Sequence, residues 1–262
     1  MSPELHVDQE CLVGYVVLRL SGRLSVRTAP AARRAMLKTL FDVGRVVVDV
    51  SGLRLVTPEC VTLLPSVLTT AGGWPAARMA IVDGDGVYEA AARRVRCADL
   101  LHFYPATEAG VRHVDDRPAR VTRDVSVPAD PSASATARRF LQQAAADWEL
   151  SPDLTEIAQL VVSELVSNAV EHAGTTSTVA LELTDERLKI SVRDGSTTQP
   201  VPRPLDMVSF RGRGLPLIDR VSQQWGIIDH QDGKTVWAAL STEAPAVAES
   251  EESSDPETDR AV

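Results

Sequence analysis

The chain has 262 residues, of which 44% are hydrophobic, and a net charge of −9 at pH 7. This length suits one large or two ordinary domains, and the acidic balance disfavours a non-specific nucleic-acid binder, so no direct nucleic-acid partner is expected. Three widely spaced cysteines indicate neither a zinc site nor a disulfide framework. The start of the chain lacks a basic-then-apolar leader and the sequence lacks a run of about eighteen apolar residues, so we expect a cytoplasmic protein with no membrane partner.

Residues 1–114 alternate between strand-like and helix-like segments, which indicates an α/β layer structure. The expected strands are Tyr15–Leu20, Arg45–Val50, Met79–Val82 and Leu101–Phe103. Each expected helix follows a residue that can cap its first turn, namely Thr28, Thr57, Asp85 and Thr107. Pro58 and Glu59 strengthen the start at Thr57, whereas Pro65 should kink that helix or cut it short before Thr70.

Three motifs in residues 1–114 are similar to those of a known protein family. Leu20-Ser21-Gly22-Arg23-Leu24, then Val46–Gly52, then the helix start at Thr57 resemble the STAS domain of anti-sigma-factor antagonists. The family pattern at the helix start is Asp-Ser-Ser/Thr-Gly, in which a serine receives phosphate. Pro58 and Glu59 hold the two hydroxyl positions here, so the resemblance implies a degenerate domain without the acceptor, and we interpret Thr57 as a helix cap.

Residues 115–120 are polar and contain Pro118, which predicts a linker, and a second domain is expected over 121–242. Residues 195–213 are rich in proline and glycine and are predicted to form a lid-like loop, and the tail 243–262 is predicted to be disordered. The expected elements of the second domain are a strand at Arg123–Val127, a helix from Asp130 to Trp148, a central helix starting at Ser151-Pro152-Asp153, a hairpin of Thr178–Leu183 with Leu188–Val192, a short helix at 215–222, and a hairpin of Trp225–Asp229 with Thr235–Leu240.

The central helix carries the most informative pattern. Its apolar residues recur at three- and four-residue spacing and form one face: Ala158, Val161, Val162, Leu165 and Ala169. Glu164, Asn168 and His172 fall at i, i+4 and i+8, so they line up along another side of the helix. This polar stripe either meets a charged ligand or simply faces water, and the helix alone does not separate the two.

Three later motifs favour the ligand. Asp194-Gly195 ends a strand-like run, Gly212-Arg213-Gly214-Leu215 precedes a short apolar helix, and Gly233–Trp237 opens the last strand-like run. Together with the central helix, their order and spacing resemble the GHKL ATPase domain, and within it the anti-sigma-factor serine kinases, over about Val121 to Leu240. The resemblance implies an α/β sandwich in which a mixed sheet is covered by helices.

The resemblance also implies ATP and Mg²⁺ as cofactors and assigns roles residue by residue. Asn168 corresponds to the metal ligand, Glu164 to the catalytic base, and Asp194 with Gly195 to the adenine site, although Ser196 and Thr198 stand where the superfamily prefers glycine. The remaining nucleotide-binding residues implied are His172, Arg211, Gly212, Arg213, Gly214, Leu215 and Thr235. His172 either touches phosphate or caps the helix end as a cation.

These roles predict a serine/threonine protein kinase of the anti-sigma type, whose implied partners are a STAS-type antagonist as substrate and a sigma factor, with a homodimer left open. The alternative is a non-catalytic, ATP-dependent binding module or scaffold. A histidine kinase would need a helical hairpin with a phosphoacceptor histidine before Val121, where this chain has an α/β domain. The short linker gives a high effective concentration, so we hypothesise that residues 1–114 block the kinase domain's substrate surface. The competing hypothesis is that they recruit the substrate protein as a scaffold.

Overall fold

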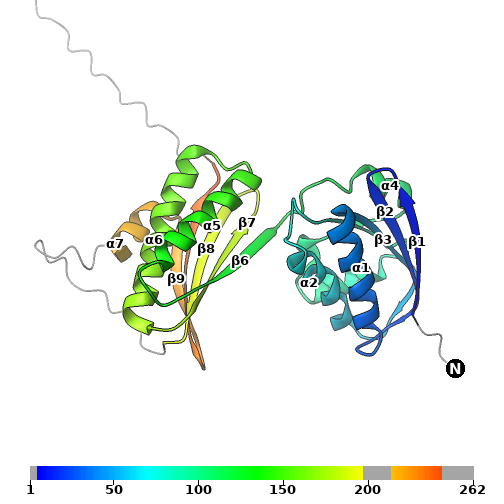
Figure 1. Ribbon diagram of the computed structural model, residues 1–262, viewed down its shortest axis with the longest axis horizontal. Helices are drawn as coiled ribbons and strands as arrows, with labels where there is room; N and C mark the ends of the chain where they lie inside the picture. Colours follow the sequence, from blue (N-terminus) through cyan, green and yellow to red (C-terminus); the bar gives the residue numbers. More distant parts are fainter. Residues whose placement is uncertain (1–4, 197–213, 244–262) are drawn as a thin grey trace, which may run out of the picture.

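The computed structural model describes residues 5–196 and 214–243, so the predictions for the lid-like loop at 197–213 and for the tail beyond 243 lie outside it. Two α/β units follow one another along the chain (Figure 1). The N-terminal unit has one five-stranded sheet, with its strands in sequence order. The first pair is antiparallel and the remaining pairs are parallel. Its strands are β1 (His6–Leu12), β2 (Tyr15–Leu24), β3 (Arg45–Leu55), β4 (Arg78–Val82) and β5 (His102–Tyr104).

Helices cover both faces of this sheet unequally. The larger core lies under α1 (Ala29–Val43), α2 (Leu63–Thr70) and α3 (Val87–Arg94), where Met36, Leu64 and Tyr88 are fully buried. The smaller core on the opposite face includes Val17, Val47 and Val82 and is covered by α4 (Thr107–Arg112). Two short 3₁₀ helices complete the unit, η1 (Pro58–Thr62) and η2 (Ala98–Leu100).

The helix start predicted at Thr57 differs from the structure. The first turn is the 3₁₀ helix η1, and α2 begins only at Leu63. Pro65 therefore falls in the first turn of α2, where no backbone N–H is needed, and it neither kinks nor ends the helix. Thr57 makes no side-chain cap bond; its Oγ1 lies 3.6 Å from the Sγ of Cys60 instead.

The C-terminal unit is a second five-stranded sheet with the order β6-β7-β8-β10-β9. Its strands are β6 (Val121–Val127), β7 (Ser177–Leu183), β8 (Arg187–Asp194), β9 (Gln224–His230) and β10 (Gly233–Ser241). Every pair within it is antiparallel, so the mixed sheet predicted from the resemblance is wrong for these strands. The reason lies in the connection between β6 and β7: two successive helices return the chain to the end where β6 stopped, so β7 runs back alongside it.

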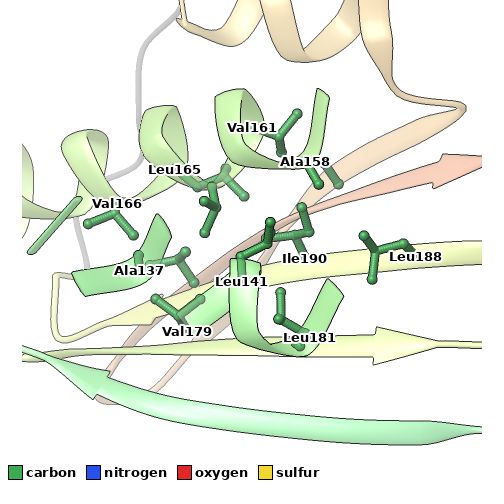
Figure 2. Close-up of a cluster of buried hydrophobic side chains, with 14 of the residues drawn as sticks. Ala137, Leu141, Ala158, Val161, Leu165, Val166, Val179, Leu181, Leu188 and Ile190 are labelled. Carbon is green, nitrogen blue, oxygen red and sulfur yellow. The ribbon is translucent and has the colours of Figure 1, made fainter. Parts of the chain in front are cut away.

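Those two helices are α5 (Ala133–Asp147) and α6 (Pro152–Ala173), and a third, α7 (Gly214–Val221), precedes β9. Figure 2 shows how α5 and α6 pack on one face of the sheet: Leu141 and Leu165 point toward Val179 and Ile190 of the strands below. Each of these four side chains is at most 1% exposed. In the described ranges 5–196 and 214–243, no helix is long and apolar enough to cross a membrane.

The antiparallel register sorts the C-terminal unit into two ends. The Asp194 end contains the end of β8, the start of β10 and the end of α6. The Asp185 end contains the β7–β8 turn, the start of β6 and the end of α5. Because α6 runs toward the Asp194 end, its predicted site residues approach Asp194.

The N-terminal unit joins the C-terminal unit at the Asp185 end, and the contacts between them define a joint. The carbonyl oxygen of Trp74 accepts hydrogen bonds from Nε1 of Trp148 at 3.3 Å and from Nη2 of Arg123 at 3.4 Å. The Arg123 guanidinium also lies over the Trp148 ring, 5.7 Å from its centroid, and pairs with Asp147 at 2.6 Å. The predicted linker, residues 115–120, therefore lies beside a packed contact between the two units.

Arg120, the last residue of the predicted linker, ties both units together. Its side chain pairs with Asp99 of the N-terminal unit at 2.7 Å and with Glu182 of β7 at 3.1 Å. Its backbone N–H also donates to the carbonyl of Asp99 at 2.8 Å. The joint holds the N-terminal unit at the end of the C-terminal sheet opposite Asp194, away from the predicted site (Figure 1). This arrangement gives no support to the hypothesis that the N-terminal unit blocks the substrate surface.

Candidate functional site

The central helix α6 begins as its sequence predicts. The Oγ of Ser151 accepts a hydrogen bond from the backbone N–H of Leu154 at 3.3 Å, with Pro152 in the first turn. This cap fixes the start of a helix whose buried residues face the sheet. At its other end, Gly174 adopts a φ of +60°, so the chain leaves the helix directly toward β7.

Two serines set the rotation of α6 about its axis. Ser163 accepts a hydrogen bond from Arg138 of α5 at 3.2 Å, and Ser167 lies 3.3 Å from the Ser134 hydroxyl of α5. Each successive residue of a helix turns by about 100°. Glu164 and Asn168 each follow one of these serines, so both are turned about a quarter of the circumference away from the line that faces α5.

Glu164 lies in a partly buried environment. Burial first, and then the negative charge of Glu171, raise the pKa of the Glu164 carboxyl. Asn168 is also half-buried, one turn closer to the Asp194 end. Within the described ranges, neither side chain makes a hydrogen bond or ion pair with another residue, so the described part of the chain leaves both available to a ligand. His172 lies on the helix at the next turn, but its side chain is outside what the structure describes.

Asp194 ends β8 on the helix-covered face and is 4% exposed. Its Oδ1 accepts a hydrogen bond from the backbone N–H of Ser196 at 2.8 Å. The next residue, Gly195, donates its N–H to Oγ1 of Thr175 at 3.0 Å, and a Cβ at 195 would lie 3.1 Å from that same oxygen. Thr175 is the second residue after α6, so this bond connects the end of β8 to the end of the central helix. The sequence analysis did not single out Thr175.

Lys234 is the site residue that sequence reasoning missed. It lies opposite Asp194 in the register of β10 and β8, and its Nζ is 3.2 Å from Oδ1 of Asp194. A lysine in a strand normally indicates a surface position, so only its place one residue after Gly233, opposite the Asp-Gly motif, could have identified it.

Thr235 is not brought to this site. Successive residues of a strand point to opposite faces, so Thr235 lies on the face away from α6. There its Oγ1 is 2.9 Å from Nε2 of His230. On the face covered by α6, the neighbouring residue Lys234 takes the place that the resemblance implied for Thr235.

The phosphate-binding turn is described only at its end. Gly214 and Leu215 form the start of α7, although their side-chain surroundings are outside the description. Arg211, Gly212 and Arg213 lie outside the described residues, as does Thr198. The structure thus brings Glu164, Asn168 and Asp194 to neighbouring elements and adds Lys234 to them.

One family model matches part of the chain. Residues 127–240 match the family model of the histidine kinase-like ATPase domain. No curated protein matches the sequence. The family match covers α5, α6 and β7–β10, the elements that carry the site described above.

Three solved structures are similar in fold. The crystal structure of an anti-sigma factor antagonist from Mycobacterium paratuberculosis is 18% identical, with 44% of this chain and 100% of that chain covered and a TM-score of 0.39. The RsbU and RsbW domains of a Mycobacterium tuberculosis protein are 22% identical, with 45% of this chain but only 32% of that chain covered and a TM-score of 0.37. The anti-sigma factor antagonist SpoIIAA in its unphosphorylated form is 16% identical, with 42% and 96% covered and a TM-score of 0.33.

The family match places a histidine kinase-like ATPase domain after the N-terminal α/β unit, where the sequence predicted a GHKL-type domain.

Proposed function

We propose that this chain, whose residues 127–240 form a histidine kinase-like ATPase domain, is an ATP- and Mg²⁺-dependent serine/threonine protein kinase of the anti-sigma type. Its substrate would be a STAS-type antagonist protein, and a sigma factor would be its second partner. The proposal would make the chain a transcriptional regulator that works by partner switching.

The observation that carries the proposal is the state of Glu164. A carboxyl that is half-buried, has a raised pKa and makes no bond to another described residue is poorly explained as a structural group. A general base needs these properties, because a raised pKa increases its affinity for the proton that it removes. A site used only to bind nucleotide would have no need of a base one helical turn from the metal ligand.

Each site residue then has a defined task. Glu164 accepts the proton of the attacking serine or threonine hydroxyl, and Asn168 offers its amide oxygen to the metal. Asp194 accepts a hydrogen bond from the exocyclic amino group of adenine. When bound, ATP supplies the transferred phosphoryl group, and its Mg²⁺ neutralises the charge that develops on the phosphate oxygens. Positioning and charge neutralisation account for most of the catalysis in such transfers.

The donor set fits a metal that arrives with the nucleotide. Within the ranges 5–196 and 214–243, no three His, Cys, Asp or Glu side chains are grouped so that they could hold an ion by themselves. Mg²⁺ usually binds through one or two protein oxygens together with phosphate oxygens and water. The single amide oxygen of Asn168 is consistent with that mode.

The test is phosphoryl transfer from γ-labelled ATP to a STAS-type antagonist that retains its acceptor serine. The full chain should label the antagonist in Mg²⁺, and Glu164→Gln should abolish labelling while still binding ATP. Glu156→Gln changes an exposed carboxylate eight residues earlier on the same helix, so it is the matched control and should remain active. ATP binding without transfer in the unmodified chain would support the alternative, a non-catalytic binding module. Sedimentation of the same samples would decide whether the chain is a homodimer.

A further inference from the structure

Lys234 and Asp194 form a buried pair of opposite charges at the site. They face each other across β10 and β8, and both point to the side of the sheet covered by α6. Their side chains are 3% and 2% exposed, respectively. Among the described residues of these two strands, their immediate same-face neighbours are Val236 and Val192, which are apolar and buried.

Stability alone does not account for such a pair. Removing two charges from water is costly, and replacing a buried ion pair by apolar residues of similar size is often neutral or stabilising. Valine or leucine would continue the apolar face of both strands at these positions. The pair is therefore better explained by something that it binds.

The two groups leave hydrogen-bonding capacity unused. Oδ1 of Asp194 accepts both from Lys234 and from the backbone of Ser196, and no donor in the described part of the chain bonds Oδ2. The Lys234 ammonium has three N–H donors, of which Asp194 takes one. An acceptor and a donor thus lie side by side at the end of the sheet where the site residues gather.

The backbone fixes this arrangement. Gly233, directly before Lys234, has a φ of +150°, and a Cβ there would overlap the carbonyl oxygen of Asp194 and lie 3.0 Å from its carbonyl carbon. Only glycine permits the start of β10 to approach the end of β8 so closely. The donor and the acceptor are consequently held in place before any ligand arrives.

We infer that Lys234 is a second base-reading residue: its ammonium donates to the ring N1 of adenine while the Asp194 carboxylate accepts from the adjacent exocyclic amino group. The inference rests on the proposed ATP site and deepens it. Adenine presents an amino donor and a ring-nitrogen acceptor next to each other on one edge, which matches the acceptor and donor of this pair. Reading a base through two adjacent bonds also selects it more strongly than one bond does.

The test compares ATP with 1-deaza-ATP, in which a C–H replaces the ring N1, by calorimetric titration of the full chain. The unmodified protein should bind ATP about tenfold more tightly than 1-deaza-ATP, as expected for a hydrogen bond from a charged donor. 7-Deaza-ATP, altered on the other side of the purine, should bind like ATP. Lys234→Met should lose the preference for ATP, and Lys234→Gln, which keeps a neutral donor, should restore part of it.

Two outcomes would overturn the inference while leaving the ATP site intact: equal binding of ATP and 1-deaza-ATP by the unmodified chain, or a preference for ATP that persists in Lys234→Met. The comparison of ATP with 1-deaza-ATP on the unmodified chain needs no variant, so it tests the inference even if Lys234→Met misfolds. Absence of ATP binding by the unmodified chain would instead refute the proposed function itself, and the inference with it.

Discussion

Gly233→Ala should be among the most damaging single-methyl changes in the C-terminal domain. The added Cβ would meet the Asp194 carbonyl, which is backbone and cannot rotate away, at a φ of +150°. A non-glycine residue in such a conformation costs about 1–3 kcal/mol. Relief of the overlap requires β10 to move from β8 and so weakens the buried pair, whose outright loss would cost about 3–5 kcal/mol.

We therefore expect Gly233→Ala to lower the free energy of unfolding by about 4 kcal/mol, near the upper range for one substitution. Gly174→Ala is the matched control, because Gly174 also has a positive φ, of +60°, but a Cβ there would meet nothing within 4 Å. It should cost only about 1–2 kcal/mol, the penalty of the left-handed conformation. Urea unfolding followed by tryptophan fluorescence measures both.

Nucleotide binding gives a second readout of the same change. Gly233→Ala displaces Lys234 from Asp194, so it should also weaken ATP binding, whereas Gly174→Ala should leave it nearly unchanged. Equal losses of stability in the two variants would refute the close approach of β8 and β10 on which this reasoning depends.

Three other predictions test the site and the joint. Asn168→Ala should abolish the Mg²⁺-dependent part of ATP affinity in calorimetry without unfolding the chain, whereas Ser167→Ala on the same helix should not. Because the folded state raises the pKa of Glu164, the free energy of unfolding should decrease as the pH rises from the ordinary carboxyl value through the raised one; Glu164→Gln should flatten that decrease in pH-dependent denaturation, and an unchanged slope would count against the raised pKa. Arg123→Ala should accelerate proteolytic cleavage within residues 115–120, and cleavage at the original rate would show that the joint does not depend on this side chain.

Local sequence signals predicted helices and strands well where interactions between residues close in sequence determine them. The Ser151-Pro152-Asp153 start of α6 and its apolar face are as expected, because capping and periodicity act within a few residues. β1 was not predicted, since His6–Leu12 is an exposed edge strand throughout and has no alternation of buried and exposed residues. At Thr57 the capping signal was present, but the turn became a 3₁₀ helix in which the hydroxyl has another neighbour.

The site was predicted in part for the same physical reason. Glu164 and Asn168 share one helix, so their spacing alone places them together. The partnership of Lys234 with Asp194 depends on which strands pair and in what register, which no local pattern specifies. Thr235 illustrates the cost of that uncertainty: an error of one residue along a strand moves a side chain to the opposite face.

The joint at Trp74 has a consequence for how far the two halves are separable modules. Trp148 belongs to the ATPase half, is only 5% exposed, and gives its indole N–H to a carbonyl of the other half. A fragment beginning at Val121 would present this indole and the Arg123 guanidinium to water beside β6, an edge strand with free backbone groups along one side. Recombination of such an ATPase half with another N-terminal domain would lose this indole hydrogen bond unless the incoming domain offered an equivalent carbonyl, so the two halves are not freely interchangeable modules.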